Sequence, residues 1–216
     1  MSMLWSILVA GIPERFHTVQ PLLLSLLETQ AVSRMPDVEL LYLMDSKRRP
    51  VGAKRNDLLA AARGTYLSFI DDDDTVADDY VRRIYRTILE SRKAKTPPDV
   101  ICFRQTAIIG ATGITHDCHY SLASYKSQPP EQRRVLATAH DKSGVLLPNV
   151  LRWSGPPAHT MVWRRELVAS IRFPEKTFGE DVAWVDLACE RATTEIQLDG
   201  EPLYTYRFDP ERSATR

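Results

Sequence analysis

Apolar runs alternate with amphipathic segments through the first half of the chain. Four runs have the length and composition of buried strands, and between them apolar residues recur at helical spacing. The pattern predicts strands at residues 5–10, 38–44, 65–70 and 100–103, and helices at 18–29, 52–63 and 77–88. Alternating strands and helices are joined by right-handed crossovers. We therefore expect an α/β fold with a mostly parallel central sheet flanked by helices.

Glycine, proline and capping residues mark the ends of these elements. Gly64 follows the second predicted helix at the place of a C-terminal cap. Pro21 is compatible with the first helix because it falls in the first turn of 18–29. Residues 75–78 resemble a capping box for the third helix. No linker or repeat interrupts the chain, so we expect a single domain of residues 1–216.

The second half of the chain has less predicted regular structure and a weaker hydrophobic periodicity. Its pattern predicts a hairpin at 110–122, strands at 159–163 and 203–208, and helices at 165–171 and 181–191. Residues 124–148 are polar and interrupted by proline, and the pattern assigns no element to them.

Composition narrows the class of protein. Lys plus Arg and Asp plus Glu both number 28, and the resulting zero net charge gives no support to a general nucleic-acid binder. Three scattered cysteines indicate reduced thiols rather than a disulfide framework. The first residues lack a basic signal-peptide region, and no apolar run has membrane-spanning length. We therefore expect a cytoplasmic protein without a transmembrane segment.

The first chemical candidate is the acidic run Asp71-Asp72-Asp73-Asp74, directly after a predicted buried strand. Four like charges repel, and a divalent metal bound by carboxylate oxygens would compensate them. A metal held in this way usually carries the phosphates of a nucleotide. The alternative is a solvated acidic turn that caps the next helix.

Three predicted loops, 11–15, 45–49 and 71–74, follow the carboxyl ends of parallel strands. Ligands of such sheets bind at that edge. The first loop is a turn that lets a ligand approach the backbone closely. The second contains Asp45 and three basic residues, and the third is the acid run. Asp45 contacts a base or ribose if the edge binds a nucleotide, and otherwise it is a turn former.

Glycine-rich phosphate-binding fingerprints are missing, so a metal and basic side chains would have to meet a nucleotide's charge. Lys54 and Arg55 lie early in the second predicted helix, where the helix dipole also favours a diphosphate. Their alternative role is a solvated helix face.

A second acidic motif, Gly179-Glu180-Asp181, opens a late predicted helix. Its acids either cap that helix or include a general base for an attacking hydroxyl. His159 and Trp184 are weaker candidates for the acceptor side, and a lone histidine is often structural.

These motifs in this order resemble the family 2 glycosyltransferases of the GT-A (Rossmann-like) fold, over nearly the whole chain. The similar segments are Ile7-Leu8-Val9-Ala10, Leu43-Met44-Asp45-Ser46, Lys54-Arg55-Asn56 through Tyr66, Phe69 through Asp74 (that family's Asp-x-Asp motif), Met161 through Leu167, and Gly179-Glu180-Asp181. The resemblance implies that residues 1–105 bind the nucleotide sugar and 106–216 the acceptor.

The resemblance also implies roles for individual residues. Asp71 and Asp73 would hold Mn²⁺ or Mg²⁺ and the ribose-diphosphate, with Asp73 the more direct ligand, and Asp181 would be the base with Glu180 beside it. The remaining residues assigned to the nucleotide sugar are Ile12, Pro13, Glu14, Arg15, Asp45, Lys54, Arg55 and Asp72. Two departures matter. Ser46 follows Asp45 where many relatives have a second acid, and Phe208-Asp209-Pro210 stands where many have a metal-binding histidine.

The implied activity is metal-dependent, inverting transfer of a sugar, expected from a UDP-sugar, to an acceptor hydroxyl. The acceptor we expect is a saccharide or lipid-linked glycan. The basic clusters Lys47-Arg48-Arg49 and Arg133-Arg134 keep a modified nucleic-acid base open. The alternatives are a sugar-phosphate nucleotidyltransferase, which the first loop disfavours because it lacks a glycine-rich basic signature, and an inactive sugar-nucleotide-binding module.

Overall fold

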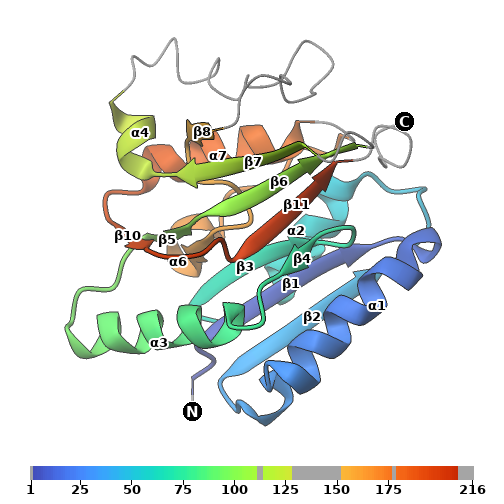
Figure 1. The fold of residues 1–216 in the computed structure, drawn as a ribbon, viewed down its shortest axis with the longest axis horizontal. Helices are drawn as coiled ribbons and strands as arrows, with labels where there is room; N and C mark the ends of the chain where they lie inside the picture. The colour runs from blue at the N-terminus through green and yellow to red at the C-terminus, as the bar shows by residue number, and fades with distance from the viewer. Residues whose placement is uncertain (1, 111–113, 128–151, 177–178, 209–216) are drawn as a thin grey trace.

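The computed structural model describes residues 2–110, 114–127, 152–176 and 179–208, which form two sheets with helices packed around them (Figure 1). The central sheet has six strands in the order β10-β5-β9-β3-β1-β2. The second has five, in the order β4-β11-β6-β7-β8. The predicted fold class, an α/β domain with a mostly parallel central sheet flanked by helices, is confirmed.

Three mostly apolar strands form one half of the central sheet, with β2 at the edge. β1 (Trp5–Gly11) pairs in parallel with β2 (Val38–Met44) and β3 (Tyr66–Asp71). β1 is buried along its whole length, as expected of a parallel strand covered on both faces. Its register places Ala10 opposite Asp71 and Gly11 opposite Met44, so the three strands end at one edge.

The other half of this sheet contains the one reversed strand. β9 (Val162–Arg164) runs antiparallel between β3 and β5 (Val100–Phe103), and β10 (Glu195–Leu198) pairs in parallel with β5. The strand predicted at 159–163 thus begins at Val162, and β10 was missed. Strands from beyond residue 105 complete the sheet, so the two predicted halves interleave. Their division into donor and acceptor sides stays a prediction.

The second sheet is built almost entirely after residue 100. Its strands are β4 (Thr75–Val76), β6 (Gln105–Ile109), β7 (Ile114–Tyr120), β8 (Arg152–Gly155) and β11 (Tyr204–Phe208). β6 and β7 form the antiparallel hairpin, so the prediction of a hairpin at 110–122 placed it too late. The capping box predicted at 75–78 is wrong, because Thr75 and Val76 pair with β11 instead.

Helices follow the strands much as predicted. They are α1 (Phe16–Leu24), α2 (Val51–Ala61), α3 (Tyr80–Lys93), α4 (Leu122–Lys126), α6 (Arg165–Val168) and α7 (Glu180–Arg191). A 3-10 turn, Pro13–Arg15, precedes α1, and a π-helical turn, Ser25–Thr29, and a 3-10 turn, Val32–Arg34, follow it. Since α1 begins at Phe16, Pro21 lies inside the helix and not in its first turn. In the described residues, no helix combines the length and apolar character that crossing a membrane requires.

Gly64 has a different role from the predicted helix cap. A Cβ atom there would lie 2.5 Å from both the Ser6 nitrogen and the Tyr66 oxygen. Glycine is therefore required because β1 and β3 approach each other closely at this point, and α2 already ends at Ala61.

An aromatic cluster fills the core beneath α7. Trp184 is fully buried, stacks on Phe173 with ring centroids 4.9 Å apart, and meets Trp163 edge-on at 5.7 Å. The prediction of Trp184 as an acceptor contact is wrong, because a fully buried ring has no surface to offer a substrate.

Candidate functional site

The three predicted loops meet at the carboxyl edge of β1, β2 and β3. The Ile12 N–H donates to Asp72 Oδ2 at 3.1 Å, which joins the first loop to the third. Lys54 Nζ donates to the Gly11 carbonyl at 3.0 Å and lies 3.3 Å from Asp45 Oδ1, which joins the first loop to the second. The predicted convergence is therefore confirmed, with Lys54 buried between the loops. Pro13 and Glu14 are exposed in the turn that follows.

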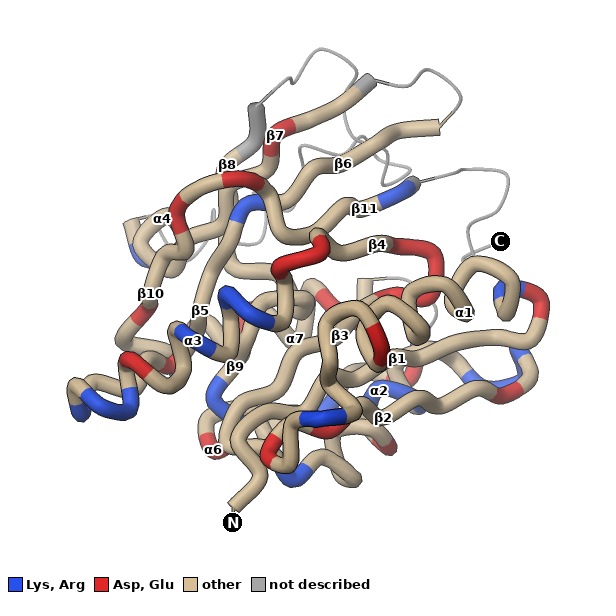
Figure 2. Tube along the Cα trace, turned by 60° about the horizontal axis from the view of Figure 1, so that its bottom comes forward, with Lys and Arg blue, Asp and Glu red and all other residues tan. Residues whose placement is uncertain are grey.

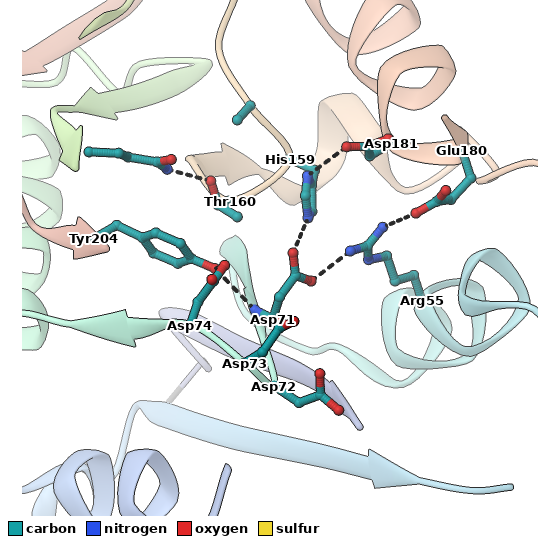
Figure 3. A network of polar contacts seen from close by, with 12 residues as sticks. Arg55, Asp71, Asp72, Asp73, Asp74, His159, Thr160, Glu180, Asp181 and Tyr204 are labelled. Carbon is teal, nitrogen blue, oxygen red and sulfur yellow. Dashed lines mark hydrogen bonds and ion pairs between the residues drawn. The ribbon is translucent and has the colours of Figure 1, made fainter. Parts of the chain in front are cut away.

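The residues of the acid run, Asp71 to Asp74, point to different parts of the protein (Figure 3). Asp71 accepts from Arg55 Nη2 at 2.6 Å, and Arg55 also contacts Glu180 at the start of α7. The Arg55 side chain is only 5% exposed. Burial acts to raise the pKa of Asp71, but the charge of Arg55 and the neighbouring His159 outweigh burial and hold it well below its ordinary value.

Asp72 and Asp73 share one cation, Arg15. Arg15 Nη1 lies 2.8 Å from Asp72 Oδ1 and 2.8 Å from Asp73 Oδ2. Asp72 is buried, whereas the Asp73 side chain is 34% exposed. Burial, joined by the negative charges of Asp71 and Asp72, raises the pKa of Asp73 to about 6 against the opposing charge of Arg15. Asp73 is thus the acid of this pair that faces solvent.

Asp74 is turned away into the second sheet. Its Oδ2 accepts from the Tyr204 hydroxyl at 2.5 Å, and its Oδ1 accepts from the Arg207 N–H at 2.7 Å. The Tyr204 oxygen also accepts from the Asp71 N–H at 3.1 Å. Tyr204 therefore ties β11 to both ends of the acid run. Sequence reasoning missed it, since a tyrosine in a late strand carries no local mark of this contact.

Asp45 is held from two sides at the end of β2. Its Oδ2 accepts from Arg49 Nε at 2.7 Å, and Arg49 also reaches Asp57 at 2.7 Å. Together with Lys54, these contacts fix the carboxylate at the edge of the sheet.

The two acids of α7 differ in their surroundings. Glu180 is buried against Arg55, and burial raises the pKa of Glu180 even against the charge of that guanidinium. The Asp181 side chain is 38% exposed, and its Oδ2 lies 3.7 Å from His159 Nδ1. His159 Nε2 lies 3.4 Å from Asp71 Oδ2 on the other side. The structure thus joins Asp181 to the acid run through His159, and leaves Asp181 the more accessible carboxylate.

The donor atoms suit a small hard cation that takes only part of its coordination from protein. Within the described residues, no three His, Cys, Asp or Glu side chains gather closely enough to hold a metal alone. Mg²⁺ typically uses one or two carboxylates and completes its shell with water and substrate phosphates. Asp73, with a side chain that is 34% exposed, and Asp71 are carboxylates that could supply such a partial shell. Asp209 and Pro210 lie outside the described residues.

Charged residues of both signs are distributed over the fold, with local groups of one sign (Figure 2). Acidic residues mark the segment entering β4, whereas α3 carries a series of basic residues (Figure 2). Arg83 of α3 binds the Asp199 and Glu201 carbonyls of the loop before β11, so part of that basic series is structural. Lys47 and Arg48 lie in the exposed turn after β2.

Comparisons with known proteins agree with this geometry. An 89-residue stretch, 41% of this chain, is 32% identical to EpsH of Bacillus subtilis strain 168, which is named as a glycosyltransferase, and covers 24% of that protein. The S. aureus TarS 1–349 structure in complex with UDP-GlcNAc matches 99% of this chain and 61% of its own, with a TM-score of 0.63 and 17% identity. The UDP complex matches 97% of this chain and 62% of its own, with a TM-score of 0.57 and 19% identity.

These matches cover different shares of each relative and support different conclusions. The chain spans about a quarter of EpsH and about three fifths of TarS 1–349. At this identity the TarS structures show a shared fold, that of a GT-A glycosyltransferase. The model for glycosyl transferase family 2 matches residues 29–146, more than half of the chain. The chain therefore belongs to glycosyl transferase family 2.

Proposed function

We propose that this protein transfers a sugar from a UDP-sugar to an acceptor hydroxyl, in a metal-dependent reaction that inverts the anomeric centre. Family membership and the UDP and UDP-GlcNAc complexes of TarS support a nucleotide-sugar donor. The observation that carries the proposal is the placement of an exposed carboxylate, Asp181, across His159 from the acid run at the sheet edge.

The donor lies along the carboxyl edge of β1, β2 and β3 in this proposal. Asp45, oriented by Arg49 and Lys54, accepts hydrogen bonds from the base or ribose. Arg15 and Arg55 pair with carboxylates of the acid run and reduce its repulsion for a diphosphate. The remaining residues of the first loop, Ile12, Pro13 and Glu14, border the nucleotide. Asp72 supports this loop by accepting a hydrogen bond from the Ile12 N–H.

Asp73 and Asp71 would hold Mn²⁺ or Mg²⁺. When bound there with the diphosphate, such an ion neutralises negative charge that develops on the leaving group. Asp73 is the more direct ligand because it is the more exposed of the two, and because Asp71 already binds Arg55.

Asp181 serves as the general base. It removes the proton of the acceptor hydroxyl as that oxygen attacks the anomeric carbon and the nucleoside diphosphate leaves. Glu180 is less suited to this role, because it is buried and engaged by Arg55. A single displacement without a covalent intermediate inverts the configuration.

We propose a saccharide or lipid-linked glycan as acceptor, and the cytoplasm as location. Cys102, Cys118 and Cys189 are all unpaired and buried, as a reducing compartment allows. A modified nucleic-acid base is the less favoured acceptor, because the formal net charge is zero.

Incubation with a panel of sugar nucleotides, glycan acceptors and Mn²⁺ tests the proposal. Release of nucleoside diphosphate, with a glycan product of inverted configuration by NMR, is the expected result. Release of pyrophosphate would indicate nucleotidyl transfer, and release of neither product with any donor would refute catalysis.

A further inference from the structure

His159 is confined between the donor-side and acceptor-side acids. Its Nε2 is 3.4 Å from Asp71 Oδ2 and its Nδ1 is 3.7 Å from Asp181 Oδ2 (Figure 3). The side chain is 9% exposed, and its ring packs against Phe69 with centroids 6.2 Å apart. The imidazole therefore lies inside the protein with one nitrogen toward each carboxylate.

The backbone that carries His159 is fixed on both sides. Ala158 accepts hydrogen bonds through its carbonyl from the Met161 N–H at 3.1 Å and from Trp163 Nε1 at 3.0 Å. Thr160 Oγ1 accepts from Gln105 Nε2 of β6 at 2.6 Å. These bonds anchor the turn to β9 in the central sheet and to β6 in the second sheet. The turn is therefore a rigid support for the ring.

The contacts of His159 close a ring of polar side chains. Glu180 binds Arg55, and Arg55 binds Asp71. Asp71 then contacts His159, which contacts Asp181, the next residue after Glu180. The pairs that Arg55 forms with Glu180 and Asp71 fix the start of α7. In the described residues, His159 is the basic side chain that contacts the Asp181 carboxylate, with Nδ1 3.7 Å from Oδ2, and the charge of Arg55 acts on that carboxylate from farther away.

Resting on the proposed function, we propose that His159 is a positioning residue for the general base. Its Nδ1 side holds the Asp181 carboxylate in the orientation that takes the acceptor proton, and its Nε2 side is anchored on Asp71. Direct contact with the acceptor is not its role, because its ring is buried between the two acids. Misplacing a catalytic group by about 1 Å can cost on the order of 10²-fold in rate.

Asparagine and glutamine separate the two nitrogens of His159. The amide nitrogen of asparagine reaches about the place of Nδ1, and that of glutamine about the place of Nε2. We expect His159→Ala to lower kcat about 10- to 100-fold with a nearly unchanged donor KM. His159→Asn should recover most of kcat, and His159→Gln should not. His119→Ala is the control, because His119 is 45% exposed and pairs with Asp117 of β7, a residue assigned no role in the site.

Wild-type kcat in His159→Ala, or recovery by glutamine and not by asparagine, would overturn the proposal. If His159→Ala fails to fold, the asparagine and glutamine variants decide by the same comparison. If the wild type transfers from no donor, the proposed function fails separately. A thermal-unfolding cycle of His159→Ala and Asp181→Asn then tests the contact: non-additive shifts in Tm support it, and additive shifts overturn it.

Discussion

Arg55 and Arg49 give a matched comparison of a buried and an exposed arginine, each pairing with two carboxylates. Arg55 contacts Asp71 and Glu180 with a side chain that is 5% exposed. Arg49 contacts Asp45 and Asp57, both at 2.7 Å, with a side chain that is 44% exposed. We expect Arg55→Met to destabilise the protein strongly and Arg49→Met to leave stability close to wild type, since water and salt screen exposed pairs.

The magnitude for Arg55 follows from its burial. Methionine fills much of the same volume but leaves Asp71 and the buried Glu180 without their shared cation. Breaking a buried pair by removing one partner costs about 3–5 kcal/mol. With about 2.1 cal/mol/K of unfolding entropy per residue, 216 residues give about 0.45 kcal/mol/K. The expected fall in Tm is therefore about 7–11 °C.

Thermal unfolding followed by circular dichroism, without nucleotide or metal, measures both variants. Adding Glu180→Gln to Arg55→Met should recover part of the loss, because it removes the buried Glu180 charge that the first substitution leaves without Arg55. Equal Tm values for Arg55→Met and Arg49→Met would refute the reasoning that burial decides the strength of these pairs.

Three further predictions concern the base, the metal and pH. Asp181→Asn should lower kcat about 10²–10⁴-fold with UDP affinity by calorimetry nearly intact, and a larger loss in Glu180→Gln would identify Glu180 as the base. EDTA or Asp73→Asn should weaken UDP binding in the same assay, and undiminished affinity under both conditions would contradict the metal assignment. The third prediction concerns Glu195. Burial acts to raise the pKa of Glu195, but hydrogen bonds led by the one from the Leu122 N–H outweigh burial and lower this pKa below its ordinary value. Its stabilisation is therefore present above the unfolded pKa of about 4.3 and lost as the pH falls through the folded pKa, so urea unfolding should show a shallower loss of stability on acidification for Glu195→Gln.

The first half of the fold could be predicted because its information is local. β1, β2 and β3 are mostly apolar runs, and parallel strands of this kind end at a common edge. That rule alone placed Asp45 and the acid run together. It did not require knowledge of any side-chain contact.

The second half depends on pairings between distant segments. β9 has three residues and inserts antiparallel between two earlier strands, and β4 has two residues that pair with β11 across the chain. Such short strands carry little periodicity, so their neighbours decide their conformation. The prediction of Trp184 on the acceptor side is wrong because its ring faces the aromatic core, an orientation that the local sequence does not reveal.

The acid run shows where a sequence argument from charge has to be refined by structure. Four adjacent carboxylates suggested one compensating metal, yet hydrogen-bond donors and arginines of the protein already pair with these carboxylates. Asp72 secures the first loop, Asp74 secures β11, and Asp71 joins α2 to α7 through Arg55. Replacing Asp72 or Asp74 should therefore act first on folding. Asp73 is different because its side chain is 34% exposed, it shares Arg15 with Asp72, and burial and the neighbouring acids raise its pKa. We therefore expect ligand binding by the run to depend most on Asp73, whose side chain is the one that, among the described residues, is paired only through the arginine it shares with Asp72.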